Sequence, residues 1–284
     1  FVTILVTGAA GFIGSNFTLN WLSHSNEQII ALDKLTYAGN LENLKSIESN
    51  PNYIFVHGDI GDSKLTAKIL KEYQPRAILN FAAESHVDRS IYGPDDFIQT
   101  NILGTYHFLK EVRTYFDELS VQLKNNFRFL HVSTDEVFGT LNADDPPFNE
   151  AKRYEPNSPY SASKASTEII FSSYLRSFIS KNNKLGAASV RAGNVIGGGD
   201  WSRDRLVPDI IRSLTKFQPI NLRNPKSTRP WQHVLEPLSG YILIAKKLYT
   251  QPKKYSGAWN FGPGNNDNIS VEIVILYIAA IFWT

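Results

Sequence analysis

Short apolar runs alternate with longer stretches of helical spacing over the first two-thirds of the chain. The runs have the length of buried strands, and the stretches between them repeat apolar residues every three to four positions. The expected strands are residues 1–6, 28–32, 53–57, 77–81, 127–133 and 185–191. The expected helices are residues 12–22, 64–72, 94–116 and 159–180. This order predicts an α/β fold with a doubly wound parallel sheet of the Rossmann type.

The alternation weakens in the last third of the chain. A loop, a helix and two turns are expected there, at residues 197–200, 206–217, 224–225 and 229–230. Because no low-complexity linker separates the two parts, we expect them to be interleaved. Residues 1–193 should form the nucleotide-binding domain with the catalytic residues, and residues 194–284 should mainly form a smaller substrate lobe.

The final segment, residues 271–284, is apolar except for Glu272 and Thr284. Its length is below the ~20 residues that span a bilayer, so we expect a buried terminal helix and no membrane partner. The segment has no polar face, and the chain contains no methionine even at its start. We therefore expect the sequence to be incomplete, with more chain covering this helix.

Composition narrows the classes of partner. The chain has 284 residues, with 29 Lys plus Arg against 27 Asp plus Glu, and it is 42% hydrophobic. It has no basic block, so we expect no nucleic-acid partner and favour small molecules. The absence of cysteine excludes disulfides and thiolate chemistry and fits a reducing, cytoplasmic compartment. The six histidines lack the spacing of metal ligands, so no metal site is expected.

A glycine-spaced turn follows the first expected strand. Gly8, Gly11 and Gly14 stand three residues apart, and Phe12 and Ile13 begin a helical pattern. Glycines allow a tight turn and the close approach of a pyrophosphate, and the new helix presents free N–H groups and partial positive charge to it. A glycine-rich turn without a ligand is the alternative.

Polar residues after the next strands extend this pattern. Asp33 ends the second strand, 19 residues after Gly14, where a carboxylate accepts hydrogen bonds from a ribose and repels a 2′-phosphate. The expected cofactor is therefore NAD. Asp59 follows the third strand and could reach the adenine amino group, although a turn aspartate is the alternative. The other residues expected to bind the cofactor here are Lys34, Ile60, Ala82 and Ala83.

Tyr160 and Lys164 are expected one turn apart on a helix. A free phenol, with a pKa of about 10, is a poor base at neutral pH. A nearby ammonium and the positive nicotinamide ring should lower that pKa. Tyr160 could then take a hydroxyl proton while hydride leaves for the cofactor, and both residues would also contact NAD. An exposed helical pair is the alternative.

Thr134, Asp135 and Glu136 follow the fifth strand. A hydroxyl here could bond the reacting alcohol, and two acids in one cleft push their pKa values apart, so that one stays protonated. Removal of water beside a carbonyl needs one base and one acid, whereas redox chemistry needs neither. Successive strand residues point to opposite faces, so this interpretation requires a bend. Two solvated loop carboxylates are the alternative.

These motifs resemble known families. The glycine turn with Tyr160-x-x-x-Lys164 is similar to the extended short-chain dehydrogenase/reductases that act on nucleotide sugars. Segments that resemble dTDP-glucose 4,6-dehydratases are residues 32–41, 82–90, 133–139 and 159–165. Segments that resemble CDP-glucose 4,6-dehydratases are residues 191–201, 223–225, 229–237 and 259–263. That second family carries lysine where this chain has Glu136.

The resemblance implies NAD-dependent conversion of a nucleotide-diphosphate-glucose to its 4-keto-6-deoxy sugar. Tyr160, tuned by Lys164 and aided by Thr134, would remove the C4 hydroxyl proton. Glu136 would remove the C5 proton, and Asp135 would protonate the departing C6 hydroxyl. The implied substrate-binding residues are Ser85, His86, Asn194, Arg229 and Asn260. The guanidinium of Arg229 can pair two phosphate oxygens, although a surface arginine is the alternative.

Several alternatives stay open. A 4-epimerase shares the fold but has no use for the two carboxylates, and a non-catalytic nucleotide-binding module does not need Tyr160. The carboxylate pair favours dTDP-glucose, our first choice, whereas the second half favours CDP-glucose. The helices at 94–116 and 159–180 could form the four-helix interface of a homodimer, as in relatives, or could be core.

Overall fold

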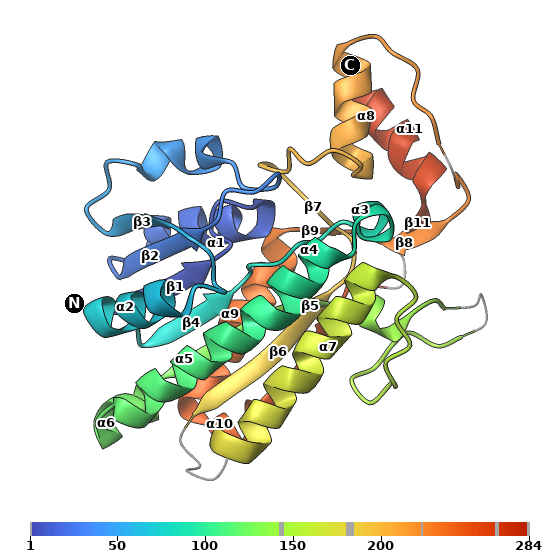
Figure 1. Ribbon diagram of the computed structural model, residues 1–284. Coiled ribbons are helices and arrows are strands. Elements are labelled where there is room, and N and C mark those ends of the chain that lie inside the picture. Colours follow the sequence, from blue (N-terminus) through green and yellow to red (C-terminus); the bar gives the residue numbers. More distant parts are fainter. Residues whose placement is uncertain (1, 142–144, 180–184, 223, 265–266, 283–284) are drawn as a thin grey trace.

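A parallel sheet of seven strands lies at the centre of the computed structural model (Figure 1), which describes residues 2–141, 145–179, 185–222, 224–264 and 267–282. The strand order is β10-β6-β5-β4-β1-β2-β3, and every neighbouring pair is parallel. The strands are β1 (Thr3–Thr7), β2 (Gln28–Asp33), β3 (Tyr53–His57), β4 (Ala77–Asn80), β5 (Arg128–Thr134), β6 (Gly186–Ala192) and β10 (Gly257–Phe261). The predicted doubly wound α/β fold is confirmed.

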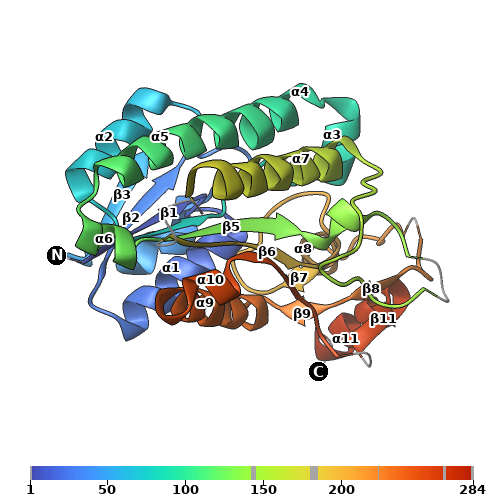
Figure 2. The same ribbon diagram turned by 90° about the horizontal axis from the view of Figure 1, so that it is seen from below.

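Helices cover both faces of the sheet (Figure 2). One layer holds α2 (Ser63–Tyr73), α5 (Thr105–Glu118) and α7 (Pro159–Tyr174), and the short helix α6 (Val121–Asn126) lies level with the end of the sheet. The other holds α1 (Phe12–His24), α9 (Leu235–Thr250) and α10 (Pro252–Tyr255). Successive strand residues serve opposite layers: Ile4 packs with Phe17 and Leu238, whereas Leu5 packs in the cluster that contains Phe108. Both faces of the sheet are therefore buried under helices, which explains why the strands are continuous apolar runs in the sequence.

Both long predicted helices are interrupted. Residues 94–116 form α4 (Asp95–Phe97), a π-helical segment η2 (Ile98–Gly104) and α5, preceded by α3 (Val87–Tyr92). Within η2 the buried Asn101 side chain bonds both the N–H and the carbonyl of Glu84, at 2.8 and 2.9 Å. The widened turn thus joins this helix to the loop after β4. The second helix continues from α7 into the π-helical segment η4 (Leu175–Ile179), and residue 180 lies outside the described residues.

The last third of the chain contributes to two regions. The helix α9 and the strand β10, which the sequence pattern does not predict, complete the main sheet and one of its layers. An outer lobe (Figure 1) contains β7 (Val195–Ile196), α8 (Leu206–Thr215), β8 (Thr228–Pro230), β9 (Gln232–His233), β11 (Asn268–Ser270) and α11 (Val271–Phe282). The predicted motif residue 223 lies outside the described part of the chain.

The prediction of a buried terminal helix is wrong for most of α11. Only one of its large apolar side chains, Val274, counts as buried in the described part, whereas Leu276 and Tyr277 are 66% and 61% exposed. Few other elements pack against this helix, chiefly α8 and β11. Residues 283–284 lie outside the described residues. In the part of the chain that the structure covers, no helix is both long and apolar enough to cross a membrane.

Candidate active site

A cavity of about 600 Å³ opens at the carboxyl ends of the central strands. It lies beside the point where the chain order reverses between β1 and β4, where open α/β sheets bind their ligands. It brings together most of the predicted site residues, from both halves of the chain. Those that line it are Gly8, Gly11, Phe12, Ile13, Gly14, Asp33, Lys34, Asp59, Ile60, Ala82, Ala83, Ser85, His86, Thr134, Glu136, Tyr160, Lys164 and Asn194.

The glycine turn is held where side chains cannot fit. Gly8 has φ +66°, and a Cβ there would lie 2.7 Å from the backbone nitrogen of Ala82. A Cβ on Gly14 would lie 2.1 Å from the carbonyl oxygen of Gly8. Because Gly11 precedes α1, no side chain caps this helix, and its first N–H groups can meet an anion. The turn therefore fits a pyrophosphate.

Asp33 is already hydrogen-bonded to the backbone. Its two carboxylate oxygens accept hydrogen bonds from the N–H groups of Ala10 and Leu35, each at 2.8 Å. Burial raises the pKa of this carboxyl, and the two N–H groups oppose that shift. Each oxygen keeps a second lone pair, so the carboxylate can still accept from a ribose. Beside it, Lys34 forms an ion pair of 2.8 Å with Asp59, so Asp59 is more than a free turn aspartate.

The bend required by the carboxylate interpretation is present. The strand β5 ends at Thr134, and the 3-10 turn η3 (Asp135–Phe138) begins at the next residue. The Thr134 hydroxyl accepts a hydrogen bond from the N–H of Glu136 at 3.3 Å and donates to Asp135 Oδ1 at 3.4 Å. Glu136 lines the cavity, whereas Asp135 lies behind it, with Oδ2 2.8 Å from the position of a Cβ on Gly193.

The two carboxyl groups bind protons more tightly than free acids do. Burial raises the pKa of Asp135 to about 6. Burial and the charge of Asp135 raise the pKa of Glu136 to about 7, although its side chain stays accessible from the cavity. The pair therefore holds about one proton near neutral pH. Glu136 therefore has the higher pKa of the two carboxyl groups. The predicted roles favour the reverse order, because Asp135 as the acid should hold its proton more tightly than Glu136 as the base.

The protein's own groups raise the pKa of Tyr160, whereas the predicted decrease included the charge of the nicotinamide ring. Burial raises the pKa of this phenol, and the charge of Glu136 raises it further. Lys164 is four residues later on α7, as predicted, but its ammonium donates to the carbonyl of Val132 at 2.8 Å. Burial lowers the pKa of Lys164 to about 8. Removal of the phenol from water outweighs the charge of Arg205 and the hydrogen bond with Thr134, which both act to lower its pKa.

The predicted substrate residues divide into two sets. Ser85, His86 and Asn194 line the cavity. Burial, with the charges of two arginines, lowers the pKa of His86 to about 4, so its imidazole is neutral. Arg229 and Asn260, both described, do not line the cavity. Arg229 lies exposed on β8 and donates to the carbonyl of Thr228, and Asn260 Oδ1 accepts from Arg191 at 3.2 Å.

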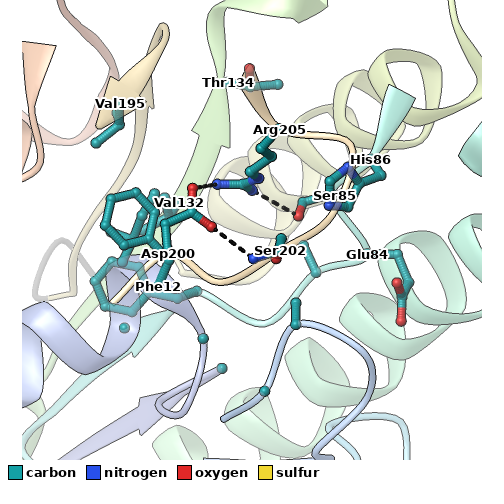
Figure 3. Close-up of a pocket in the computed structure, with 18 of the residues that line it drawn as sticks. Phe12, Glu84, Ser85, His86, Val132, Thr134, Val195, Asp200, Ser202 and Arg205 are labelled. Carbon is teal, nitrogen blue, oxygen red and sulfur yellow. Dashed lines mark hydrogen bonds and ion pairs between the residues drawn. The ribbon is translucent and has the colours of Figure 1, made fainter. Parts of the chain in front are cut away.

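Two arginines that line the cavity, Arg205 and Arg212, were not predicted. Arg205, the residue before α8, donates to Asp200 Oδ2 at 3.2 Å and to Ser85 Oγ at 3.3 Å (Figure 3). Its charge acts to lower the pKa values of both Tyr160 and Glu136. A basic residue between the glycine loop at 197–199 and a predicted helix was the available signal. The Asp200–Arg205 pair thus brings the outer lobe to the catalytic residues.

Comparisons with known proteins agree with this geometry. The sequence profile of a family described as GDP-mannose 4,6 dehydratase matches residues 5–261. A dTDP-glucose 4,6-dehydratase of Xanthomonas campestris is 41% identical over 96% of this chain and 74% of its own length. A CDP-glucose 4,6-dehydratase of Salmonella typhimurium is 37% identical over 96% of this chain and 74% of its own.

A solved structure extends the comparison to the fold. DesIV, a dTDP-glucose 4,6-dehydratase of Streptomyces venezuelae crystallised with NAD and TYD bound, has a TM-score of 0.81 and 33% sequence identity. The match covers 98% of this chain and 81% of that one. The predicted resemblance to nucleotide-sugar 4,6-dehydratases is confirmed, and the chain belongs to the GDP-mannose 4,6 dehydratase family.

Proposed function

We propose that this protein dehydrates a nucleotide-diphosphate-glucose to the 4-keto-6-deoxy sugar with NAD as its resident cofactor. The observation that carries the proposal is that Glu136, with Asp135 directly behind it, lies in the same cavity as Tyr160 and Lys164. An epimerase would need only the last two. dTDP-glucose is the first candidate substrate because of the 41% identical relative, and CDP-glucose is the second because of the 37% identical one.

The residues on the cofactor side fit NAD. The cramped glycine turn, the uncapped start of α1 and the carboxylate of Asp33 suit a pyrophosphate and an unphosphorylated ribose. When bound, NAD supplies the oxidant that takes hydride from C4 and, once reduced, the donor that returns it at C6. Lys164 would keep at least one N–H free for the nicotinamide ribose while it donates to Val132.

The protein's own groups handle the protons. Thr134 and Tyr160 would bind the C4 hydroxyl, and Tyr160 would accept its proton. The charge of Arg205 and the hydrogen bond with Thr134 lower the pKa of Tyr160 against the cost of burial, and the positive nicotinamide ring of bound NAD would lower it further, so that the phenolate needed for this transfer can form. Glu136 would take the C5 proton beside the new ketone and return a proton to C5 when hydride reaches C6, and Asp135 would protonate the departing C6 hydroxyl so that it leaves as water. The pair holds about one proton near pH 7. Transfer of that proton from Glu136 to Asp135 would leave Glu136 ready to act as the base and Asp135 ready to act as the acid.

Cations and amides on the other side of the cavity suit the diphosphate. Arg205 presents a guanidinium there, and Asn194 adds an amide. Arg229 acts on the carboxylates from β8, where its charge opposes their raised pKa values. Apart from α9 and β10, residues 194–284 would form the lobe that binds the nucleotide sugar.

Incubation with dTDP-, CDP- and UDP-glucose tests the proposal. The expected result is a 4-keto-6-deoxy product, fastest from dTDP-glucose, without net consumption of NAD. Inversion at C4 with no loss of water would identify an epimerase instead. Binding of NAD without any change in the three sugars would favour a non-catalytic module.

We also propose a homodimer that pairs the helices η2, α5 and α7 of two copies. Large apolar side chains on this side of the molecule are exposed, including Tyr106 at 40%, Ile169 at 56% and Tyr92 on α3 at 91%. Contiguous apolar surface of this kind favours a protein interface. Sedimentation of the Ile169→Glu variant should give a monomer where the parent protein gives a dimer.

A further inference from the structure

The segment 197–201, here called the strap, crosses from the outer lobe to the nucleotide-binding domain. Its five residues all line the cavity, as do the glycine turn and Asp33. Opposite it lie α1 and the 3-10 helix η1 (Leu41–Ile47). The strap is therefore one wall of the space on the cofactor side.

Asn43 on η1 uses both ends of its amide on the strap. Its Nδ2 donates to the carbonyl of Gly199 at 2.9 Å, and its Oδ1 accepts from the indole N–H of Trp201, also at 2.9 Å. Asn16 on α1 adds a third bond, from Nδ2 to the carbonyl of Gly198 at 2.8 Å. These partners are more than 150 residues apart in sequence, so the bonds join separate parts of the fold.

The strap's shape suits this attachment. Gly199 has φ +85°, a conformation that side chains disfavour, and a Cβ there would lie 3.4 Å from Asn43 Oδ1. The helix η1 is in turn bonded to the glycine turn. The N–H of Asn40 donates to the carbonyl of Ala10 at 2.9 Å, and the N–H of Asn43 donates to the carbonyl of Asn40 at 3.1 Å. Hydrogen bonds thus join the glycine turn to η1, and η1 and α1 to the strap, along this wall of the cavity.

We propose that Asn43 is a clasp: a positioning residue that holds the strap closed and slows the release of the dinucleotide. The inference rests on the proposed function, in which one hydride is removed and later returned, so the reduced cofactor must stay bound between the two transfers. Departure through this side requires the strap to open, and opening breaks the bonds to Asn43. Each such hydrogen bond contributes modestly to the stability of the closed strap, so release of the cofactor is slowed but not prevented.

The direct test is the rate at which bound NAD leaves. Asn43→Asp keeps the acceptor for Trp201 but replaces the donor to Gly199 with an oxygen that faces a carbonyl. We expect NAD to dissociate about tenfold faster from this variant, measured by chasing radiolabelled NAD with unlabelled NAD. Asn125→Asp makes the same change on the exposed surface of the remote helix α6 and should release NAD at the parent rate.

A second pair of variants separates the clasp from general loosening of the fold. Trp201→Phe keeps an aromatic side chain but removes the indole N–H together with the five-membered ring, which belongs to a side chain that is 65% exposed, and we expect about threefold faster release. In an Asn43→Ala background the same change should have no further effect, because its partner is already absent. Equal effects in both backgrounds, or unchanged release in Asn43→Asp, would overturn the clasp. If Asn43→Asp fails to fold, the Trp201 cycle decides.

The outcome is distinguishable from a failure of the proposed function. NAD release is measured without any sugar, so it does not depend on which reaction the enzyme performs. The parent protein could dehydrate no nucleotide-glucose while Asn43→Asp still releases NAD faster. That result would support the role of Asn43 and contradict the proposed dehydratase function. If dehydration is normal and the Asn43→Asp variant releases NAD at the parent rate, only the proposed role of Asn43 is contradicted.

Discussion

Glu168 on α7 and Arg191 on β6 form a buried bidentate ion pair. Arg191 Nε lies 2.8 Å from Glu168 Oε1, and Nη2 lies 2.7 Å from Oε2, with the two side chains 1% and 2% exposed. Tyr154 bonds both partners, at 3.2 Å to Glu168 and 2.7 Å to Arg191. Glu168 is four residues after Lys164 on α7, so this pair joins the helix that carries Tyr160 and Lys164 to the sheet.

Breaking this pair from one side should destabilise the protein strongly. Arg191→Met leaves the Glu168 carboxylate buried without its cation, and we expect a loss of about 3–5 kcal/mol in the free energy of unfolding. The double variant Arg191→Met/Glu168→Leu removes both charges and should recover much of that loss. Urea denaturation measures both values, and a single variant as stable as the parent would show that the pair carries little energy.

The second prediction concerns the glycine turn. Gly14→Ala places a methyl group where the carbonyl oxygen of Gly8 would be 2.1 Å away, so the turn or α1 must shift. We expect at least a tenfold loss of NAD affinity and a lower melting temperature. Gly262→Ala is the matched control, because a Cβ there meets nothing within 4 Å. Calorimetric NAD titration that gives equal affinities for both variants would contradict the steric account.

The third prediction separates catalysis from binding at Tyr160. Tyr160→Phe removes the only oxygen of a buried side chain on the cavity wall and keeps its ring against Phe97. We expect turnover to fall by about 10²–10⁴-fold, the usual contribution of a general base, with NAD affinity nearly unchanged. Turnover assays alongside NAD titration check this, and full turnover in Tyr160→Phe would contradict the role of Tyr160 as the base.

The fourth prediction is the pH dependence of stability. Glu136 has a pKa of about 7 in the folded protein, above its ordinary value of 4.5. Between those values the folded state holds a proton that the unfolded state has released, so this group lowers stability as pH rises. Glu136→Gln should therefore stabilise the protein by about 1 kcal/mol at pH 8 relative to pH 5, a value reduced for solvent access. Denaturation curves that shift equally at both pH values would contradict the raised pKa.

The first half of the fold and most of the cavity were predictable because they depend on local pattern. The helix α9 was not, since Pro237 and Gly240 interrupt its sequence. The structure explains Gly240: a Cβ there would lie 2.2 Å from the ring of Phe261, so the glycine allows α9 to pack on β10. The need for a glycine at position 240 thus comes from its contact with Phe261, which lies far away in the sequence, and not from the local sequence pattern.

The errors at the site have the same origin. A Tyr-x-x-x-Lys spacing places two groups on a helix but does not show how far the phenol is removed from water, so the burial that raises its pKa could not be predicted. The motif at residues 259–263 suggests a substrate-binding Asn260 but does not show that Arg191 occupies its side-chain oxygen. Burial and long-range partners decide both cases, and neither can be read from a single sequence.

The most direct test of the central claim follows the hydrogen on C5 in D₂O with dTDP-glucose as substrate. Glu136→Gln should reduce its NAD once and then stop, with no deuterium at C5 and no 4-keto-6-deoxy product. Asp135→Asn should also fail to release water at the parent rate, yet exchange C5 hydrogen for deuterium, because the base remains. Rapid product formation with C5 deuteration in Glu136→Gln, followed by NMR and mass spectrometry, would contradict the proposed role of the carboxylate pair.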